Sequence, residues 1–178
     1  MMWTATNTHI GEEKELLKAH KQILKKIPNT LLIIIPRHIE RCNEIIKITK
    51  KTSLDYKLIS NEKKRKSNSF KKQFQVLIVN IIGETSIFYK TCDLAFIGGS
   101  LKNKGGHNML EAACLKKSII LGHSTFNFEY ISQKLYIRVH CLDKSSNINL
   151  ALWYSYEALS GWGSGKVFLD IFLKIQKN

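Results

Sequence analysis

Short apolar runs alternate along most of the chain with segments of helical spacing. The most apolar run, Leu31–Ile35, has the length of a buried strand, and the other runs are bounded by polar or turn-forming residues. The pattern predicts strands at Trp3–Thr6, Leu31–Ile35, Tyr56–Ile59, Gln75–Val79, Leu94–Ile97, Ser118–Leu121 and Tyr136–Val139.

Between these runs, apolar residues recur with the spacing of one helix face. One such helix begins near Glu12 and a second follows Pro36; their apolar positions are Leu16, Leu17, Ile23, Leu24 and Ile27, then Ile39, Cys42, Ile45, Ile46 and Thr49. Shorter helices are predicted around Tyr89, at Met109–Cys114 and at Phe128–Leu135. Strands that alternate with helices predict the α/β class, with a Rossmann-like parallel sheet covered by helices on both faces.

Three segments lack this periodicity. Asn61–Lys72 is polar and basic and predicts an exposed loop, Ser145–Asn147 predicts a second loop, and Gly161–Gly165 is a glycine-rich break. With 178 residues the chain is long enough for one domain with a substantial core. We therefore expect a single domain over 1–178, whose part 140–178 has a weak pattern and ends in a closing helix at 167–175.

The composition is that of a globular domain, with 44% apolar and 24% charged residues. No apolar run approaches the ~18–20 residues that span a bilayer, and the start of the chain lacks the features of a secretory signal. The four cysteines are widely scattered and show no metal-ligand spacing. These observations predict a soluble intracellular domain with free thiols and no metal.

The chain carries 28 Lys and Arg against 14 Asp and Glu, a formal net charge of +14. Such an excess favours anionic partners, although abundant Lys, Ile and Asn together are also typical of an AT-rich genome. The run Lys63–Lys66 is either a solvated loop or a contact with lipid or phosphate. Aromatic residues are not interleaved with basic ones as RNA-stacking surfaces require, so no nucleic acid partner is expected.

In parallel sheets, ligands bind beyond the carboxyl ends of the strands, and two polar turns fall there. Pro36-Arg37-His38 follows the second predicted strand, where Arg37 is either a phosphate clamp at a helix N-terminus or a surface charge. Gly83-Glu84 follows the fourth strand, where Glu84 either accepts ligand hydroxyl groups or favours the first turn of a helix.

The most unusual segment is Gly98–Glu111, in which two Gly-Gly pairs flank a polar loop between a strand and a helix. Its backbone N–H groups are predicted to wrap a phosphate, helped by the helix dipole. Asn108 and Glu111 have the spacing of a helix cap and its partner, but they are also placed to hold ribose hydroxyls. After the sixth strand, Asn127 is a candidate helix cap, the phenylalanines on either side of it are expected to pack, and His123 is a candidate base without an evident partner carboxylate.

Six segments together resemble the C-terminal half of 3-deoxy-D-manno-octulosonic acid (Kdo) transferases. In family order they are Thr8–Glu13 (THIGEE), Pro36–Arg41 (PRHIER), Ile82–Glu84 (IGE), Asp93–Ser100 (DLAFIGGS), Gly105–Ala113 (GGHNMLEAA) and Ser124–Ile131 (STFNFEYI). The similarity extends over about residues 3–135. The combination GGS…GGHN-x-LE with PRH is specific to this family.

The resemblance implies one half of a GT-B glycosyltransferase, which binds CMP-Kdo for transfer of Kdo to the lipid A precursor of lipopolysaccharide. It implies no cofactor and no metal. It also implies a place at the cytoplasmic face of the bacterial inner membrane, and leaves open whether the domain itself contacts the membrane surface. The residues that it assigns to CMP are Pro36, Arg37, Ile82, Gly83, Glu84, Asn108, Met109, Leu110 and Glu111.

The sequence also departs from the family pattern. The family's N-terminal domain, with its catalytic base and acceptor site, has no counterpart in the chain, so we expect a fragment or one part of a split enzyme that is inactive alone. Asn80-Ile81-Ile82 stands where Asp-Thr precedes the Gly-Glu turn, Met109 replaces a proline, and His123-Ser124 replaces Pro-His. Residues 140–165 match poorly. The alternative function is a non-catalytic nucleotide- or RNA-binding basic domain.

Overall fold

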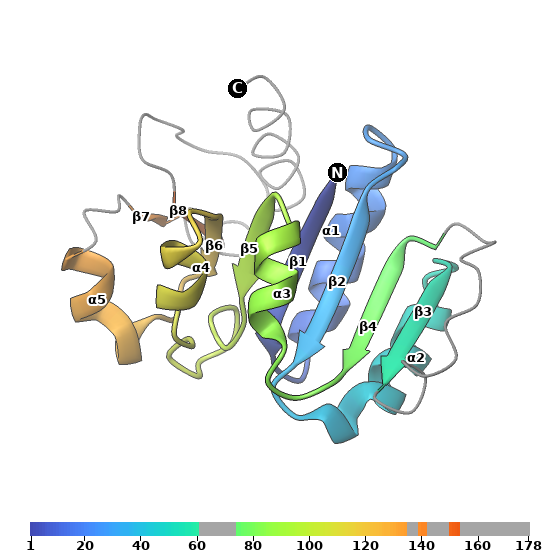
Figure 1. Cartoon of the computed structure of the whole chain (residues 1–178), viewed down its shortest axis with the longest axis horizontal. Helices are drawn as coiled ribbons and strands as arrows, with labels where there is room; N and C mark the ends of the chain where they lie inside the picture. The colour runs from blue at the N-terminus through green and yellow to red at the C-terminus, as the bar shows by residue number, and fades with distance from the viewer. Residues whose placement is uncertain (61–73, 135–138, 142–149, 154–178) are drawn as a thin grey trace.

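The computed structural model of the chain describes residues 1–60, 74–134, 139–141 and 150–153. Its strands form one sheet in the order β3-β4-β2-β1-β5-β6-β8-β7 (Figure 1). They are β1 (Met2–Thr8), β2 (Leu31–Pro36), β3 (Tyr56–Ser60), β4 (Val76–Asn80), β5 (Leu94–Ile97), β6 (Ser118–Gly122), β7 (Val139–Cys141) and β8 (Leu150–Trp153).

The six strands from β3 to β6 in this order are parallel to one another, and the strand order reverses at β1. From β1 the chain moves outward to β2, whereas the connection that leaves β4 crosses back to β5 on the other side of β1. Loops that leave neighbouring strands in opposite directions open a crevice at the carboxyl ends of β1 and β5. This is where a parallel sheet of this order holds a ligand.

Helices cover both faces of the sheet. Figure 1 shows α3 in front of the sheet and α1 behind it. The helices are α1 (Glu12–Leu24), α2 (Cys42–Lys50), α3 (Thr85–Thr91), α4 (Leu110–Cys114) and α5 (Glu129–Lys134), with short 3-10 turns η1 (Ile39–Arg41) and η3 (Phe126–Phe128).

The core is divided by the sheet. Side chains of α1 and α2 pack with Trp3, Ala5 and Ile34 on one face. On the other face, α3 and α4 contribute Tyr89 and Met109 to a second cluster. Each fully buried aliphatic side chain in these clusters stabilises the fold by about 1.5–3 kcal/mol.

The predicted fold class is confirmed, and the first six predicted strands form within two residues of their expected ends. The helix near Glu12 begins as predicted but ends at Leu24, before Ile27. The expected end of the sheet was wrong in one respect. The described part of the seventh predicted strand, Val139, belongs to β7, which pairs antiparallel with β8 rather than extending the parallel sheet. The strand β8 was missed, because a run as short as Leu150–Trp153 carries no distinguishing periodicity. The loop predicted at Asn61–Lys72, those at 145–147 and 161–165, and the closing helix lie outside the described residues.

Three thiols, those of Cys42, Cys92 and Cys114, are free, as expected. Among the residues whose structure is described, no helix is long and apolar enough to cross a bilayer. Within the same residues, no group of histidine, cysteine and carboxylate side chains has the arrangement of a metal site.

The core contains a buried histidine whose pKa is lowered. His20 of α1 is completely buried, and its Nδ1 accepts a hydrogen bond from Trp3 Nε1 at 3.1 Å. Its Nε2 lies 2.9 Å from the carbonyl oxygen of Gln75, so Nε2 carries the proton and the ring is neutral. A second proton on Nδ1 would face the indole N–H. Burial lowers the pKa of His20 to about 4, against the opposing effect of the Gln75 carbonyl.

We expect the fold to lose stability as the pH falls from about 6.5 to 4. The unfolded chain takes up a proton on His20 near its ordinary pKa of about 6.5, whereas the folded protein does so only near pH 4, so the loss reaches about 3 kcal/mol at pH 4. Urea unfolding midpoints at pH 7, 6, 5 and 4.5 measure this slope. His20→Gln, which keeps an acceptor for Trp3, should make this slope shallower, and His123→Gln at an exposed position should not. An unchanged slope in His20→Gln would contradict the assignment.

Candidate functional site

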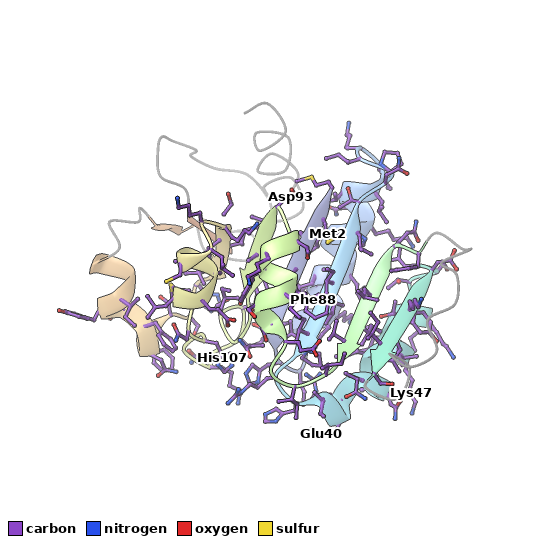
Figure 2. All side chains as sticks on the ribbon, in the orientation of Figure 1. Met2, Glu40, Lys47, Phe88, Asp93 and His107 are labelled. Atoms are coloured by element: carbon purple, nitrogen blue, oxygen red, sulfur yellow. The ribbon has the colours of Figure 1, made fainter. Side chains whose placement is uncertain are left out.

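The loops that follow the parallel strands meet at the lower edge of the sheet in Figure 1. Figure 2 labels His107 and Glu40 at this edge and Met2 and Asp93 at the opposite one. All the residues predicted to contact a ligand lie in these loops or at the first turns of the helices that follow them.

Pro36 ends β2, and Arg37 is exposed directly after it. The backbone N–H of Arg37 is not free, because it donates to the carbonyl of Thr8 at 3.2 Å. The next helix starts as the turn η1 only at Ile39. Arg37 therefore contributes a cationic side chain rather than a helix N-terminus, and its charge acts on His107 from across the crevice.

The turn after β4 is open to solvent. Ile82 is 76% exposed, and Gly83 has a φ of +82° with no atom within 4 Å of where a Cβ would lie. Glu84 precedes α3 but makes no capping bond to it through its side chain. Glu84 lies at the N-terminus of α3, where a negative charge favours the helix, and the space above Gly83 allows a ligand to approach the backbone.

The segment predicted to wrap a phosphate, Gly98–Glu111, uses the N–H groups of both Gly-Gly pairs and of Leu101 within the protein. Gly98 donates to Thr6, Gly99 and Leu101 donate to Glu12, Gly105 donates to Ser124 and Gly106 donates to Gly99, so these groups are already engaged without a phosphate. A glycine is needed at 98 because a Cβ would lie 2.2 Å from the carbonyl oxygen of Asn7. The close approach that requires glycine is therefore made by the protein's own backbone.

At the start of α4, only part of the predicted capping box forms. Asn108 is exposed, and its Oδ1 accepts the N–H of Leu110 at 2.9 Å, so it caps the helix. Glu111 does not complete the capping box; it is exposed, and its carboxylate makes no hydrogen bond or ion pair to a described residue. Met109 is 1% exposed and packs in the core, so only its backbone can reach a ligand.

The expected help from a helix dipole is weak here, because α4 is only five residues long. Leu110, at its first position, is partly exposed. Of this predicted set, Asn108, Leu110 and Glu111 thus present side chains to solvent near the crevice.

The segment after β6 also differs from expectation. Asn127 does not cap a helix; its amide donates to the carbonyl of Lys104 at 3.0 Å and its N–H to that of Gly105 at 3.1 Å. Phe126 is 60% exposed rather than packed, whereas Phe128 packs against the core. His123 is exposed, so nothing in its surroundings makes it a base.

Sequence reasoning missed the side chain that joins the two central loops. Glu12 is completely buried and accepts three backbone hydrogen bonds, from His9 at 2.8 Å and from Gly99 and Leu101 at 2.9 Å. It thereby fixes the loop after β5 to the start of α1. A carboxylate directly after the glycine of THIGEE is the signal that was present in the sequence.

A second buried carboxylate joins α1 to the turn η1. Glu13 is inaccessible to solvent and is held by both terminal nitrogens of Arg41, at 2.7 and 3.2 Å. Arg41 also reaches Glu44 at 3.2 Å and the carbonyl of Thr8 at 3.4 Å. Burial alone would lower the pKa of Arg41, but the hydrogen bonds and charge of Glu13 raise it overall.

Three histidines at the crevice were also missed. Nε2 of His9 lies 2.7 Å from Nε2 of His107, and the ring of His38 stands edge-on to His9 at 6.2 Å between centroids. Burial lowers the pKa of both His9 and His107, that of His107 to about 4, and neighbouring cationic groups lower them further.

Two buried polar atoms at this edge lack a partner among the residues that the structure describes. They are Oγ1 of Thr8, at the end of β1, and Oδ1 of Asn80, at the end of β4. Buried polar groups in native proteins are nearly always hydrogen-bonded to protein, water or ligand. Unpaired atoms on both sides of Pro36 indicate that this edge is completed by a ligand or by water.

The arrangement suits an anionic, hydroxyl-bearing ligand. Arg37 and Lys104 supply positive charge without an ion pair to any described carboxylate, and Glu111 supplies an acceptor for hydroxyl groups.

The chain is similar to known proteins over most of its length. It is 39% identical over 134 residues to the 3-deoxy-D-manno-octulosonic acid transferase of Haemophilus influenzae, covering 75% of this chain and 30% of that protein. It is 34% identical over 127 residues to the transferase of the same name from Aquifex aeolicus, covering 68% and 31%. No protein-family model matches the chain.

Among solved structures, the chain is similar to the C-terminal CMP-Kdo binding domain of WaaA from Acinetobacter baumannii. The TM-score is 0.73 at 26% identity, and the match covers 99% of this chain and 80% of that one. The chain spans only about 30% of the length of the curated relatives. The resemblance in the six sequence segments is thus confirmed by sequence and by fold, and the chain belongs to the 3-deoxy-D-manno-octulosonic acid transferase family of glycosyltransferases, where it corresponds to the C-terminal domain.

Proposed function

We propose that the carboxyl edge of the sheet binds the nucleotide-sugar donor CMP-Kdo. The observation that carries this proposal is the convergence of the loops after β2, β4 and β5 at the crevice where the strand order reverses. The CMP-Kdo binding domain of the Acinetobacter baumannii protein, which has the same fold, supports it.

In this proposal each loop contributes a different contact. The cationic side chain of Arg37, next to Pro36, binds the phosphate. The backbone of Ile82 and Gly83 borders the open space into which the nucleotide fits, with Glu84 beside it. Asn108 and Glu111 hold ribose hydroxyls, while Met109 and Leu110 contribute mainly backbone.

The same contacts assist the reaction as well as binding. When the bond between Kdo and CMP breaks, negative charge grows on the phosphate of the departing CMP. Arg37 and Lys104 are already in place at the crevice, so their positive charge stabilises this phosphate without reorganisation. No residue of the described chain is assigned as the catalytic base.

The wider activity is part of the proposal. The domain acts with an N-terminal domain that supplies the base and positions the lipid A precursor as acceptor, at the cytoplasmic face of the bacterial inner membrane. Proximity of donor and acceptor across two domains is what the transfer requires. A single C-terminal domain would then bind the donor and leave it unreacted.

Arg37→Ala and Glu111→Ala should each weaken CMP binding about 10- to 100-fold, because each removes a charge-assisted hydrogen bond to the ligand. Isothermal titration of CMP at pH 8 into the whole chain measures the affinity. Lys18→Ala is the matched control, since Lys18 is an exposed cation of α1 paired only with Glu15. Urea midpoints equal to wild type should accompany both losses.

One outcome would contradict the donor site. Salt-sensitive binding of RNA that is indifferent to Arg37→Ala and Glu111→Ala, without saturable CMP binding, would replace the donor site by a basic RNA-binding surface.

A further inference from the structure

The closest contact between the loops after β1 and β5 is made by two imidazoles. Nε2 of His9 and Nε2 of His107 are 2.7 Å apart, and the rings are nearly coplanar, at 3° with centroids 5.0 Å apart. At this distance one nitrogen must carry a hydrogen and the other a lone pair. The contact lies at the crevice where the strand order reverses, and we call these two residues the histidine pair.

The geometry limits how many protons the histidine pair can hold. When it is neutral, the ring that donates at Nε2 has a bare Nδ1, and the accepting ring carries its hydrogen on Nδ1. One further proton, taken from solvent onto that bare Nδ1, gives the pair a charge of +1 and keeps the bond between the Nε2 atoms. A second would put hydrogens on both Nε2 atoms and break the 2.7 Å contact. The pair therefore accepts one proton.

Both Nδ1 atoms are available for a ligand. No described residue is hydrogen-bonded to Nδ1 of His9 or of His107, and both side chains are partly exposed. The protonated pair would offer two Nδ1–H donors, and the neutral pair only one.

The surroundings of the histidine pair are mostly cationic. From the β2–α2 segment, His38 and the cations Arg37 and Arg41 face it, with Glu40 3.7 Å from His38. The loop after β5 contributes Lys104, whose charge acts on His9. It also contributes Lys102, whose side chain packs against Gly11.

The carboxylates near the histidine pair do not balance these cations. Glu12 accepts the backbone N–H of His9 and two further N–H groups, and Glu13 is paired with Arg41. Burial lowers the pKa of both rings. At His9 the charge of Glu12 opposes this effect, but the neighbouring cations add to it and the pKa stays lowered, so the empty site keeps the pair neutral at neutral pH. A bound anion reverses the sign of the local field and favours the protonated pair.

We propose that the histidine pair is part of the recognition site for the phosphate of the donor, and that it takes up one proton from solvent when that phosphate binds. The inference rests on the proposed function, because it concerns the same crevice. It adds a pair of ligand-contacting residues and a proton to the bound state. Donor binding should therefore tighten as the pH falls, by up to tenfold per pH unit between the pKa values of the free and the occupied site.

The test needs a ligand whose own charge stays fixed. CMP titrates near pH 6 at its phosphate, so the probe is the methyl ester of CMP, a phosphodiester as in the donor. Isothermal titration at pH 8, 7 and 6, repeated in buffers of different ionisation enthalpy, gives both the dissociation constant and the number of protons taken up. The expected result is a 10-fold or larger gain in affinity from pH 8 to 6, with up to one proton bound.

Variants separate a titrating role from a packing role. His9→Gln and His107→Gln each keep a hydrogen-bonding side chain but leave one titrating ring, so only the double variant His9→Gln/His107→Gln should abolish proton uptake and flatten the pH dependence. His123→Gln, an exposed histidine outside the crevice, should leave both unchanged.

The possible failures are distinguishable. Saturable binding of the methyl ester without proton uptake, or proton uptake that persists in the double variant His9→Gln/His107→Gln, overturns the role of the histidine pair and leaves the donor site standing. Absence of binding of both CMP and its methyl ester at pH 8 overturns the proposed function, and this inference with it.

Discussion

Arg41→Met is expected to destabilise the fold by about 3–5 kcal/mol, among the largest effects of any single substitution in the described chain. The guanidinium of Arg41 is held 2.7 and 3.2 Å from the two carboxylate oxygens of Glu13, whose side chain is completely buried. Methionine keeps much of the apolar volume but leaves a carboxylate without a counter-charge or solvent. The penalty is that of an isolated buried charge rather than of a lost surface ion pair.

The double variant Glu13→Gln/Arg41→Met separates the penalty of the unpaired buried charge from the loss of the ion pair itself. Removing the charge of Glu13 as well should restore part of the stability, so the double variant should be more stable than Arg41→Met alone. Glu44→Gln is the matched control: Glu44 also pairs with Arg41, but its side chain is 46% exposed and the expected loss is below about 1 kcal/mol. Urea unfolding at pH 7.5 measures all three. A loss in Arg41→Met no larger than in Glu44→Gln would contradict the structural role of Glu13.

The strands were predictable because each carries its own signal. Leu31–Ile35 and Leu94–Ile97 are short apolar runs that become buried central strands. A strand that is buried on both faces is recognisable from its own apolar sequence, without knowledge of the strands beside it. The order of the strands has no such local signal. It depends on the crossover from β4 to β5, so the position of the crevice followed only from the general rule for parallel sheets.

The side chains that shape the site were harder to predict, because their partners come from distant segments. Glu12 and Gly99 are far apart in the chain, and so are His9 and His107, yet each couple is in direct contact. Spacing suggested a phosphate-wrapping loop at Gly98–Gly106, because a glycine-rich sequence does not reveal whether the atoms that approach it belong to a ligand or to the protein. In this chain Glu12 takes two of the N–H groups that a phosphate would have used.

The two buried carboxylates are neutralised by different groups of the protein. Glu13 is neutralised by Arg41 from the β2 side, and Glu12 by backbone N–H groups from the β1 and β5 loops. With both satisfied inside the protein, neither competes with a ligand for Arg37 or Lys104. The positive charge at the crevice is therefore left for the donor, which connects the fold of the THIGEE segment with the proposed anion site.

Glu12→Ala should destabilise the fold by about 4 kcal/mol, because it leaves three buried N–H groups, those of His9, Gly99 and Leu101, without their acceptor. Glu12→Gln should cost about half as much: its oxygen can take the position that accepts two of the bonds, but its NH2 group then faces the N–H of Leu101.

The same substitutions should also affect the site, since Glu12 fixes the loop that carries Lys104 and His107. Hydrogen exchange of the amides of Gly99 and Leu101 reports this loop directly and should speed up in Glu12→Ala at urea concentrations well below the unfolding transition. Glu15→Ala on the same helix is the matched control, because Glu15 makes only an ion pair with Lys18 at the surface. Protection at Gly99 and Leu101 that is the same in Glu12→Ala as in Glu15→Ala would mean that the loop after β5 holds its shape without this carboxylate, and the link between the two central loops would have to be sought in the contact of His9 with His107 instead.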